Sequence, residues 1–136
     1  MASVFTRIMN GELPGRFVYR DEKCAAFLTI APLKPGHTLV VPIEEVDHWI
    51  DLPEHLASHL FQVAQKISKG MQQAFEPEKV GLMIAGLEVP HVHLHLVPIW
   101  HVHDLDFSKQ DKDPDPAMMD AAMQQLREAI GWQPDE

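Results

Sequence analysis

The sequence predicts a single α+β domain in which helices pack on a mainly antiparallel sheet. Two observations favour this class. Segments with the apolar pattern of β-strands come in hairpin-like pairs toward both ends of the chain, and one long amphipathic segment lies between them. The 136 residues, of which 46% are apolar and 23% charged, suit one compact domain spanning residues 1–136.

The first third of the chain is expected to hold a short helix and three strands. Val4, Phe5, Ile8 and Met9 recur at helical spacing and predict a helix that ends near Gly11. Apolar runs bounded by turn residues predict the strands, which are residues 17–19, 25–30 and 37–41. Pro42 is expected to stop the third strand, because proline has no amide hydrogen to donate within a sheet.

A long helix is expected after Asp51. Asp51 and Glu54 have the spacing of a capping box, in which the first carboxylate accepts from first-turn amides and the second reaches back. The residues that follow form one apolar stripe: Leu56, Leu60, Val63, Ala64, Ile67 and Met71. We expect this stripe to pack on the sheet.

The last part of the chain is expected to hold two strands and a final helix. The strands are residues 80–85 and 89–99, joined by a short turn around Gly86. Residues 104–116 are rich in Asp, Lys and Pro and predict a mobile loop. Asp115 and Pro116 suit the start of an amphipathic helix that ends at Gly131.

Charge and cysteine content argue against several classes of protein. The net charge of −9, without a cluster of Lys and Arg, argues against nucleic-acid binding. Cys24 is the only cysteine and lies in an apolar stretch, so we expect a small buried residue rather than a reactive thiol. The sequence contains neither an apolar run of membrane-spanning length nor the pattern of a signal peptide, so no membrane partner and a cytoplasmic location are expected.

Five of the nine histidines lie between residues 91 and 103. His91, His93 and His95 alternate with apolar residues, so on a strand their imidazoles would share one face. Two chemistries fit. Neutral imidazoles can bind a transition metal, with His101 or His103 as further ligands. Alternatively, one imidazole attacks phosphorus while the others hold its tautomer and neutralise developing charge. Spacing alone leaves both open.

The residues around the three histidines resemble the signature of the histidine-triad (HIT) family: Val89-Pro90-His91-Val92-His93-Leu94-His95-Leu96-Val97-Pro98. Residues 7–14 resemble the family's first helix and turn, and residues 26–42 resemble its second and third strands. The resemblance covers most of the expected core, residues 3–100, and implies a HIT-like fold with a five-stranded sheet. Residues 101–114 would then be the loop and residues 115–131 the C-terminal helix.

The resemblance also implies a mechanism. Members of the family are nucleotide hydrolases and transferases, such as phosphoramidases and dinucleoside polyphosphate hydrolases. They usually form homodimers and need no cofactor or metal for the central step. His93 would attack the α-phosphorus of a nucleoside phosphate ester, amide or anhydride and form a covalent nucleotidyl-histidine. His91 would orient His93 through its backbone carbonyl, and His95 would contact the phosphate or the leaving group. His37 would extend the relay, although a structural role explains it nearly as well.

Matching to the family implies an apolar nucleobase pocket formed by Val4, Phe5, Ile8, Phe27 and Ile30. Each of these side chains could equally be an ordinary part of the hydrophobic core, and this is the better explanation for Ile8 and Ile30. The flat rings of the two phenylalanines suit a purine face. Thr29, Glu88 and Val89 complete the expected contacts with the substrate.

The chain departs from the family's pattern at two places outside the triad loop. Residues 3–6 stand where many relatives have Cys-x-x-Cys, and Glu45 lies near a further histidine position, so the resemblance implies that the family's structural zinc site is absent. Thr29 stands where an acidic residue holds the ribose. Its hydroxyl can still hydrogen-bond, but without the charge and the two acceptor oxygens of a carboxylate.

A third departure lies directly before the triad. Leu87 and Glu88 replace the Gln and the Ser or Thr of the family's phosphate-binding run. Glu88 would repel phosphate, act as a base toward water, or pair with Lys34 or a protonated histidine.

Three hypotheses follow, in order of preference. The first is a phosphorus-transferring hydrolase or transferase that acts through His93 on a nucleotide. The second is a nucleotide-binding or partner-binding module with weak activity, favoured by Thr29, Leu87 and Glu88. The third is a metal hydrolase that uses the three clustered histidines.

Overall fold

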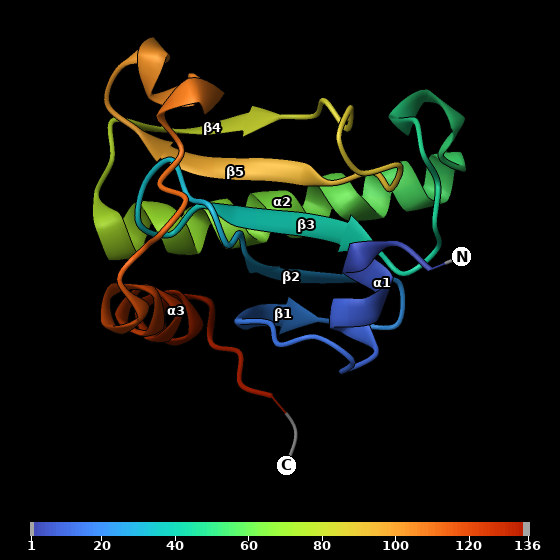
Figure 1. Cartoon of the computed structure of the whole chain (residues 1–136), viewed down its shortest axis with the longest axis horizontal. Helices are drawn as coiled ribbons and strands as arrows, with labels where there is room; N and C mark the ends of the chain where they lie inside the picture. Colours follow the sequence, from blue (N-terminus) through green and yellow to red (C-terminus); the bar gives the residue numbers. More distant parts are fainter. Residues whose placement is uncertain (1, 135–136) are drawn as a thin grey trace.

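The computed structural model describes residues 2–134. One antiparallel sheet of five strands runs through the molecule in the order β1-β2-β3-β5-β4 (Figure 1). The strands are β1 (Phe17–Arg20), β2 (Cys24–Leu28), β3 (Thr38–Pro42), β4 (Lys79–Met83) and β5 (Leu94–Ile99). The helices are α1 (Val4–Met9), α2 (Glu54–Phe75) and α3 (Pro116–Ile130). The predicted α+β class with a five-stranded antiparallel sheet is confirmed.

The central strands β2 and β3 are buried on both faces, so their alternate side chains enter two different cores. On one face, side chains of β2, β3 and β5 pack against α2 and α3; the larger members of this core include Leu60, Ile67, Met71, Leu96 and Leu126. On the other face a smaller core joins the sheet to α1; its buried members are Phe5, Met9, Ala25, Phe27, Leu39 and Val41. Most of the second face lies outside this small core, and that is where the triad lies.

Helix α2 uses its predicted apolar stripe to cover the sheet. All six residues of the stripe are buried, and full burial of one such side chain stabilises the fold by about 1.5–3 kcal/mol. The predicted capping box is wrong. Asp51 closes a 3-10 turn (Trp49–Asp51), and α2 begins after Pro53, whose side chain has no hydrogen-bonding group. The turn shifts the helix start by two residues, from an N-cap at Asp51 to one at Pro53, so Asp51 lies too early to reach the first-turn amides.

The two shorter helices agree with the sequence prediction. Helix α1 ends at Met9 and is followed by Gly11 in the left-handed region (φ 84°), which favours glycine. Helix α3 is capped by Asp115, whose carboxylate accepts from the Ala117 amide at 3.2 Å, and it ends at Gly131. Both helices begin at an N-cap side chain, because Ser3 caps α1 in the same way.

The strands around the triad differ most from the prediction. Strand β5 begins at Leu94 rather than residue 89, so only His95 of the triad lies on a strand. The link between β4 and β5 is an irregular segment over residues 84–93, not a short turn around Gly86. Backbone contacts outside the sheet hold this segment: the Val92 amide donates to the Val46 carbonyl at 2.7 Å. Such a pairing between distant residues leaves no periodic signal in the sequence.

Smaller differences concern strand ends. Strand β2 begins at Cys24 and stops at Leu28, so Thr29 and Ile30 lie beyond it. Strand β3 begins at Thr38, one residue after His37, and includes Pro42 as its last residue. Pro42 lacks an amide hydrogen, but its carbonyl accepts from a ring nitrogen of His91 at 2.8 Å.

The segment predicted as a mobile loop has regular turns. It contains two 3-10 helices, Val102–Leu105 and Phe107–Lys109, and is tied to the loop after β2. The Asp111 amide donates to the Pro32 carbonyl at 2.9 Å, and the Gln110 side chain donates to the Ala31 carbonyl at 2.9 Å. Within residues 2–134, none of the helices combines the length and apolarity needed to cross a membrane.

Candidate active site

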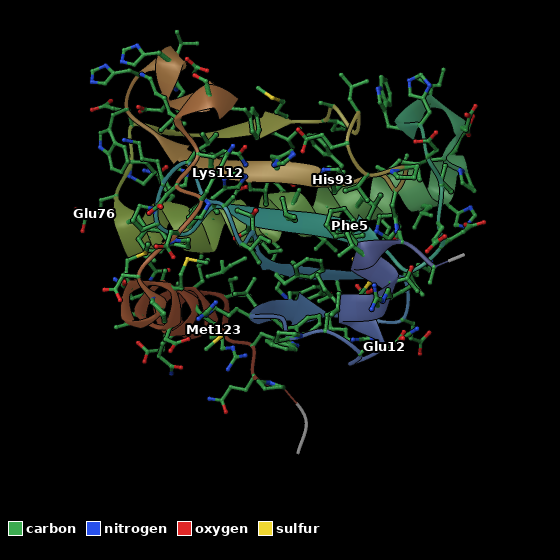
Figure 2. The ribbon with its side chains drawn as sticks, in the orientation of Figure 1. Phe5, Glu12, Glu76, His93, Lys112 and Met123 are labelled. Carbon is green, nitrogen blue, oxygen red and sulfur yellow. The ribbon has the colours of Figure 1, made fainter. Side chains whose placement is uncertain are left out.

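The triad lies on the sheet face opposite α2 and α3, beside α1. The register of the sheet lines up Phe27, Leu39, His95 and Met83 across β2, β3, β5 and β4 on this face. His93 lies at the edge of this row next to Phe5 of α1, with ring centroids 4.8 Å apart (Figure 2). A hollow of about 250 Å³ opens beside the row. Its lining residues are Ala85, Gly86, Leu87, Glu88, His93, His95, Phe107 and Gln110.

The backbone of His91 orients the ring of His93. Nδ1 of His93 lies 2.8 Å from the carbonyl oxygen of His91. A carbonyl only accepts, so Nδ1 carries the proton and donates it, and Nε2 of a neutral ring keeps its lone pair. The residue is only 7% exposed, but its ring lines the hollow. The arrangement presents an unprotonated ring nitrogen to any molecule that enters.

A second hydrogen-bond chain sets the tautomer of His95. The Leu33 amide donates to Nδ1 of His37 at 3.0 Å, so the proton of His37 lies on Nε2. Nε2 of His37 lies 2.9 Å from Nδ1 of His95 and donates to it. A neutral His95 therefore carries its own proton on Nε2. The ring centroids of His95 and His93 lie 4.8 Å apart. The neutral His93 has a lone pair on Nε2, and the neighbouring His95 has a donor on its Nε2.

Burial keeps these rings neutral. Burial lowers the pKa of His37 to about 3, with a smaller effect of the neighbouring His95 and His93. Burial also lowers the pKa of His95 to about 4, again helped by His93. The pKa of His93 is lowered by burial as well, although its hydrogen bond to His91 and the charge of Glu88 partly oppose this. Near neutral pH all three rings are uncharged, which is the state a nucleophile requires.

His91 is wholly buried and does not line the hollow. Its Nε2 donates to the Pro42 carbonyl at 2.8 Å, and its Nδ1 lies 2.6 Å from the Ser3 hydroxyl, which must therefore be the donor. The ring of His91 packs against Phe5 of α1, as the ring of His93 does, with centroids 5.8 Å apart. It is covered, however, and does not open onto the hollow.

Ser3 belongs to a polar cluster with Thr6 and Glu45. Glu45 accepts from the Ser3 amide and from the Thr6 hydroxyl, both at 2.6 Å. The Ser3 hydroxyl accepts from the Thr6 amide at 3.1 Å while it donates to His91. The cluster connects α1 to the segment after β3 and to the triad. It thereby supports the His91 backbone that holds His93.

Two residues of the site were not predicted from the sequence. Phe107 packs against the rings of His95 and His37, at centroid distances of 4.8 and 6.2 Å, and lines the hollow together with Gln110. Both belong to the segment predicted as a loop. A single aromatic residue within an otherwise polar segment was the available signal, since such a ring usually packs somewhere.

Glu88 lines the hollow, close enough to raise the pKa of His93. Of the roles considered for it, pairing with Lys34 is wrong. Lys34 pairs with Asp104 at 3.5 Å, and two backbone amides together with this lysine lower the pKa of Asp104 to about 2. Leu87, the other departure before the triad, is 95% exposed. Among residues 2–134, neither a lysine nor an arginine lines the hollow.

The residues expected around a nucleobase fall into two groups. Phe5 and Phe27 are buried and contact each other with centroids 5.9 Å apart, and Ile8 and Val89 pack partly buried beside them. Val4 and Ile30 are 40% and 78% exposed, so the core explanation preferred for Ile30 is wrong. Ile30 lies past the end of β2, where alternation no longer directs its side chain inward.

Thr29, expected near the ribose, is partly buried just after β2. Its hydroxyl oxygen accepts from the Ala31 amide at 3.3 Å, a local turn contact that leaves its hydrogen available to donate.

Hydrogen bonds occupy most ring nitrogens of the triad, so few of them remain to coordinate a metal. Both ring nitrogens of His91 are engaged, as are Nδ1 of His93 and Nδ1 of His95. One nitrogen on each of His93 and His95 remains. His101 and His103 stack on each other, with ring planes 5° apart, on exposed backbone away from the hollow. A metal hydrolase with three triad ligands would have to break the bonds that position the rings.

Comparison with known proteins agrees with this geometry. Residues 10–102 match the model of the HIT domain family. The protein Hit of Bacillus subtilis is 31% identical over 125 residues, which cover 79% of this chain and 85% of that protein. The adenosine 5'-monophosphoramidase of Saccharomyces cerevisiae is 28% identical and is matched over 82% of this chain and 77% of its own length. The asymmetrical bis(5'-nucleosyl)-tetraphosphatase of Schizosaccharomyces pombe is 34% identical over 68% of this chain, but only about half of that protein (52%) is matched.

A solved structure shares the whole fold. The histidine triad nucleotide-binding protein of Sulfolobus tokodaii superimposes with a TM-score of 0.82 at 31% identity, over 93% of this chain and 91% of that one. The superposition covers nearly all of both chains. This chain belongs to the HIT domain family.

Proposed function

We propose that this chain is a nucleotide hydrolase or transferase that attacks the α-phosphorus of a nucleoside phosphate ester, amide or anhydride with Nε2 of His93. The 2.8 Å hydrogen bond from His93 Nδ1 to the His91 carbonyl is the observation that carries the proposal. It leaves a neutral imidazole with its lone pair on the side of the hollow. The named activities of the yeast phosphoramidase and the fission yeast tetraphosphatase support the same reaction class.

The reaction divides into two displacements at phosphorus. In the first, Nε2 of His93 forms a bond to phosphorus, and the leaving group departs with the electron pair of its own bond. The imidazole becomes positively charged, and its Nδ1 proton then donates more strongly to the His91 carbonyl. In the second, water attacks phosphorus and gives up a proton to solvent, and the bond between Nε2 and phosphorus breaks with its electron pair returning to Nε2. The nucleoside monophosphate is then released. Two displacements have lower barriers than one difficult step.

His95 is proposed to hydrogen-bond the reacting group. Its Nε2 proton is held in place by the bond from His37 to its Nδ1, so the donor needs no rearrangement during the reaction. A fixed donor in a partly buried site stabilises charge that develops on phosphate oxygens or on the leaving group. His37 acts through His95 and is a positioning residue in this scheme.

The nucleoside would lie along the side of the hollow toward α1. Val4, Phe5, Ile8, Phe27, Ile30 and Val89 form the apolar surface proposed for the base. Thr29 would donate its hydroxyl hydrogen to the ribose. A single neutral hydrogen bond holds a ribose less firmly than a carboxylate does, so the base is expected to contribute most of the nucleoside affinity.

A second function, a nucleotide-binding module with weak activity, is favoured by one observation. Glu88 and the exposed Leu87 line the hollow, where a phosphate would meet a negative charge and an apolar side chain. Phosphate donors are then restricted to His95, the Gln110 amide and backbone N–H groups. This lining predicts weak affinity for highly charged polyphosphates and a preference for substrates with fewer charges.

The test begins with a panel of nucleotides scanned by thermal shift, followed by hydrolysis assays on the ligands that stabilise the chain. His93→Asn should bind the same ligands with unchanged affinity and lack turnover. The wild type should accumulate a nucleotidyl adduct on His93, found by mass spectrometry after quenching in denaturant at neutral pH. Full activity in His93→Asn would refute the proposal. Micromolar binding without hydrolysis by the wild type would establish the second function instead.

We also propose a homodimer, as in the family. The apolar stripe of α2 does not provide the interface, because it packs on the sheet within the chain. The outer strand β4 is a better surface, because an outer strand has unpaired backbone groups and Leu82 on it is 42% exposed. Light scattering coupled to size exclusion should give the mass of two chains, and Leu82→Lys should reduce it to one.

A further inference from the structure

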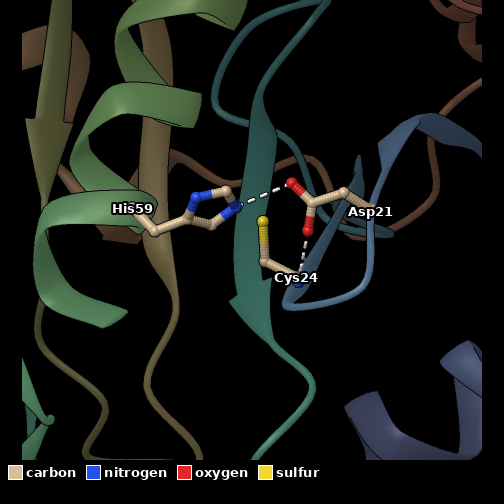
Figure 3. A group of neighbouring side chains, drawn as sticks. All are labelled: Asp21, Cys24 and His59. Carbon is tan, nitrogen blue, oxygen red and sulfur yellow. Dashed lines mark hydrogen bonds and ion pairs between the residues drawn. The ribbon is translucent and has the colours of Figure 1, made fainter. Parts of the chain in front are cut away.

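Three side chains with metal-binding groups meet on the sheet face opposite the triad. Asp21 comes from the turn between β1 and β2, Cys24 is the first residue of β2, and His59 projects from α2 (Figure 3). One ligand atom of each residue lies within 4.8 Å of the others. We propose that Asp21, Cys24 and His59 form a binding site for a transition-metal ion of the zinc type.

The ligand set suits such an ion. Zinc binds thiolate sulfur, imidazole nitrogen and carboxylate oxygen, at about 2.3 Å for sulfur and about 2.0–2.2 Å for the others. A thiolate and a carboxylate together balance the two positive charges of the ion, so the loaded site is neutral. Neutrality matters because Cys24 is fully buried. The side chains of His59 and Asp21 are 28% and 24% exposed, which leaves a solvent side for water as a fourth ligand.

The turn between β1 and β2 fixes the orientation of the Asp21 carboxylate. Oδ1 of Asp21 accepts from the backbone amides of Lys23 and Cys24, at 2.8 and 2.9 Å. Oδ2 is the oxygen directed at His59, with Nε2 at 2.7 Å, and it also accepts from the Tyr19 hydroxyl at 2.9 Å. A tetrahedral ion needs about 3.3 Å between a nitrogen and an oxygen ligand. The imidazole must therefore withdraw by roughly half an ångström, which its partly exposed position permits.

Binding can be written with balanced protons. The Cys24 thiol loses its proton to solvent, and the sulfur lone pair forms the bond to the metal. The proton between His59 and Asp21 moves to Nδ1 of a neutral His59, which frees Nε2 to bind. Tyr19 keeps its bond to the carboxylate. The metal thus replaces the proton that links His59 Nε2 to Asp21 Oδ2 in the metal-free chain.

An ion pair alone explains only part of the cluster. The contact between Asp21 and His59 ties the first hairpin to α2 without any help from sulfur. Alanine or valine at position 24 would fill the same buried space at the start of β2. The thiol beside the pair is therefore the feature that favours a metal ligand.

Cobalt(II) gives a specific readout because Cys24 is the only cysteine of the chain. We expect reduced protein titrated with Co²⁺ to develop a near-ultraviolet sulfur-to-cobalt charge-transfer band with a stoichiometry of one, and Zn²⁺ to displace it. Cobalt bound to the triad cannot produce this band. Loss of first-coordination groups should weaken binding by about tenfold or more.

Variants locate the site. Cys24→Ser and Cys24→Ala should lose the band, and circular dichroism must show that they remain folded. His59→Gln can keep a hydrogen bond to Asp21 and should bind Co²⁺ at least about tenfold more weakly. His55→Gln, on exposed surface one turn earlier on α2, is the matched control and should titrate like the wild type. Absence of the band in folded wild type at millimolar Co²⁺, or equal affinity in His59→Gln, overturns the proposal.

Discussion

Nε2 of His37 lies 2.9 Å from Nδ1 of His95, and the bond joins the residue before β3 to the second residue of β5. This bond, together with the Leu33 amide on the other side of the His37 ring, determines which nitrogen of His95 carries a proton. His37→Phe removes the donor and leaves a buried acceptor unpaired, at a cost of about 1–3 kcal/mol. We expect kcat to fall by about five- to a hundredfold, with little change in KM.

His37→Gln, which retains an amide donor, should recover part of that loss. His55→Gln on the exposed side of α2 should leave kcat unchanged. Steady-state kinetics of the three variants measures these effects. Equal activity of His37→Phe and the wild type would show that His37 is purely structural.

The pH dependence of turnover should reflect the lowered pKa of His93. The nucleophile must be neutral, and it is neutral above its pKa, which burial holds below the ordinary value of 6.5. Turnover should therefore stay constant from pH 8 to pH 6.5 and decline only in more acidic solution. Because the Glu88 carboxylate raises this pKa, Glu88→Gln should move the acid limb to lower pH.

Glu88→Gln should also lower KM for anionic substrates by up to about fivefold, the effect of removing one exposed repulsive charge. An acid limb that stays at the same pH in this variant would mean that Glu88 does not act on His93. Glu12→Gln, an exposed acid on the turn after α1, serves as the control.

Stability should also depend on pH in a defined window. His37 and His95 have pKa values of about 3 and about 4 in the folded chain, against 6.5 when unfolded. Below pH 6.5 the unfolded chain takes up protons that the folded chain does not, so the free energy of unfolding falls as the pH falls. The carboxylates with lowered pKa values lose their contribution only below about pH 4.5.

Urea denaturation between pH 7 and pH 5 therefore isolates the histidines. His37→Phe should reduce the slope of stability against pH in this range. A free energy of unfolding that stays constant from pH 7 to pH 5 would contradict the neutral, buried state of these rings.

The Ser3 hydroxyl supports both α1 and the triad. It caps the helix at the Thr6 amide and donates to His91 at 2.6 Å. Ser3→Ala should lower the free energy of unfolding by about 1–2 kcal/mol and should reduce kcat, because the His91 carbonyl that holds His93 loses its support. Ser3→Thr keeps the hydroxyl and should retain both. Loss of stability in Ser3→Ala without any change of kcat would show that Ser3 caps α1 but does not support the triad.

Affinity for the base should depend on Phe5. Phe5→Leu keeps most of the buried apolar volume but removes the ring that contacts His93 and Phe27. We expect the Kd of purine nucleotides to rise by about three- to tenfold, from the loss of an aromatic contact worth roughly 0.5–1.5 kcal/mol. Phe61→Leu on the exposed side of α2 is the matched control, and isothermal titration calorimetry is the measurement. An unchanged Kd in Phe5→Leu would show that the base does not bind beside α1.

The sequence by itself determined the fold class, the helices and the approximate position of every strand. Helical spacing located α1, α2 and α3, and the caps at Asp115 and Gly131 were read correctly, because these signals come from residues close together in the chain. The apolar residues that alternate with the histidines, which are Val92, Leu94 and Leu96, lie in the core, as strand alternation would place them. The motif around His93 indicates the family from the sequence alone, and the chain belongs to that family.

The tertiary structure alone decided what each histidine of the triad contacts. Strand alternation predicted that His91 shares a face with the other two, but it gave no sign that the ring of His91 is covered and hydrogen-bonds to Ser3 and Pro42. The two proton positions that matter, on Nδ1 of His93 and on Nε2 of His95, follow from partners at the His91 carbonyl and at His37. Contacts between residues far apart in the chain leave no periodic pattern in the sequence. These contacts nevertheless decide which ring nitrogens of His93 and His95 carry a proton and which carry a lone pair.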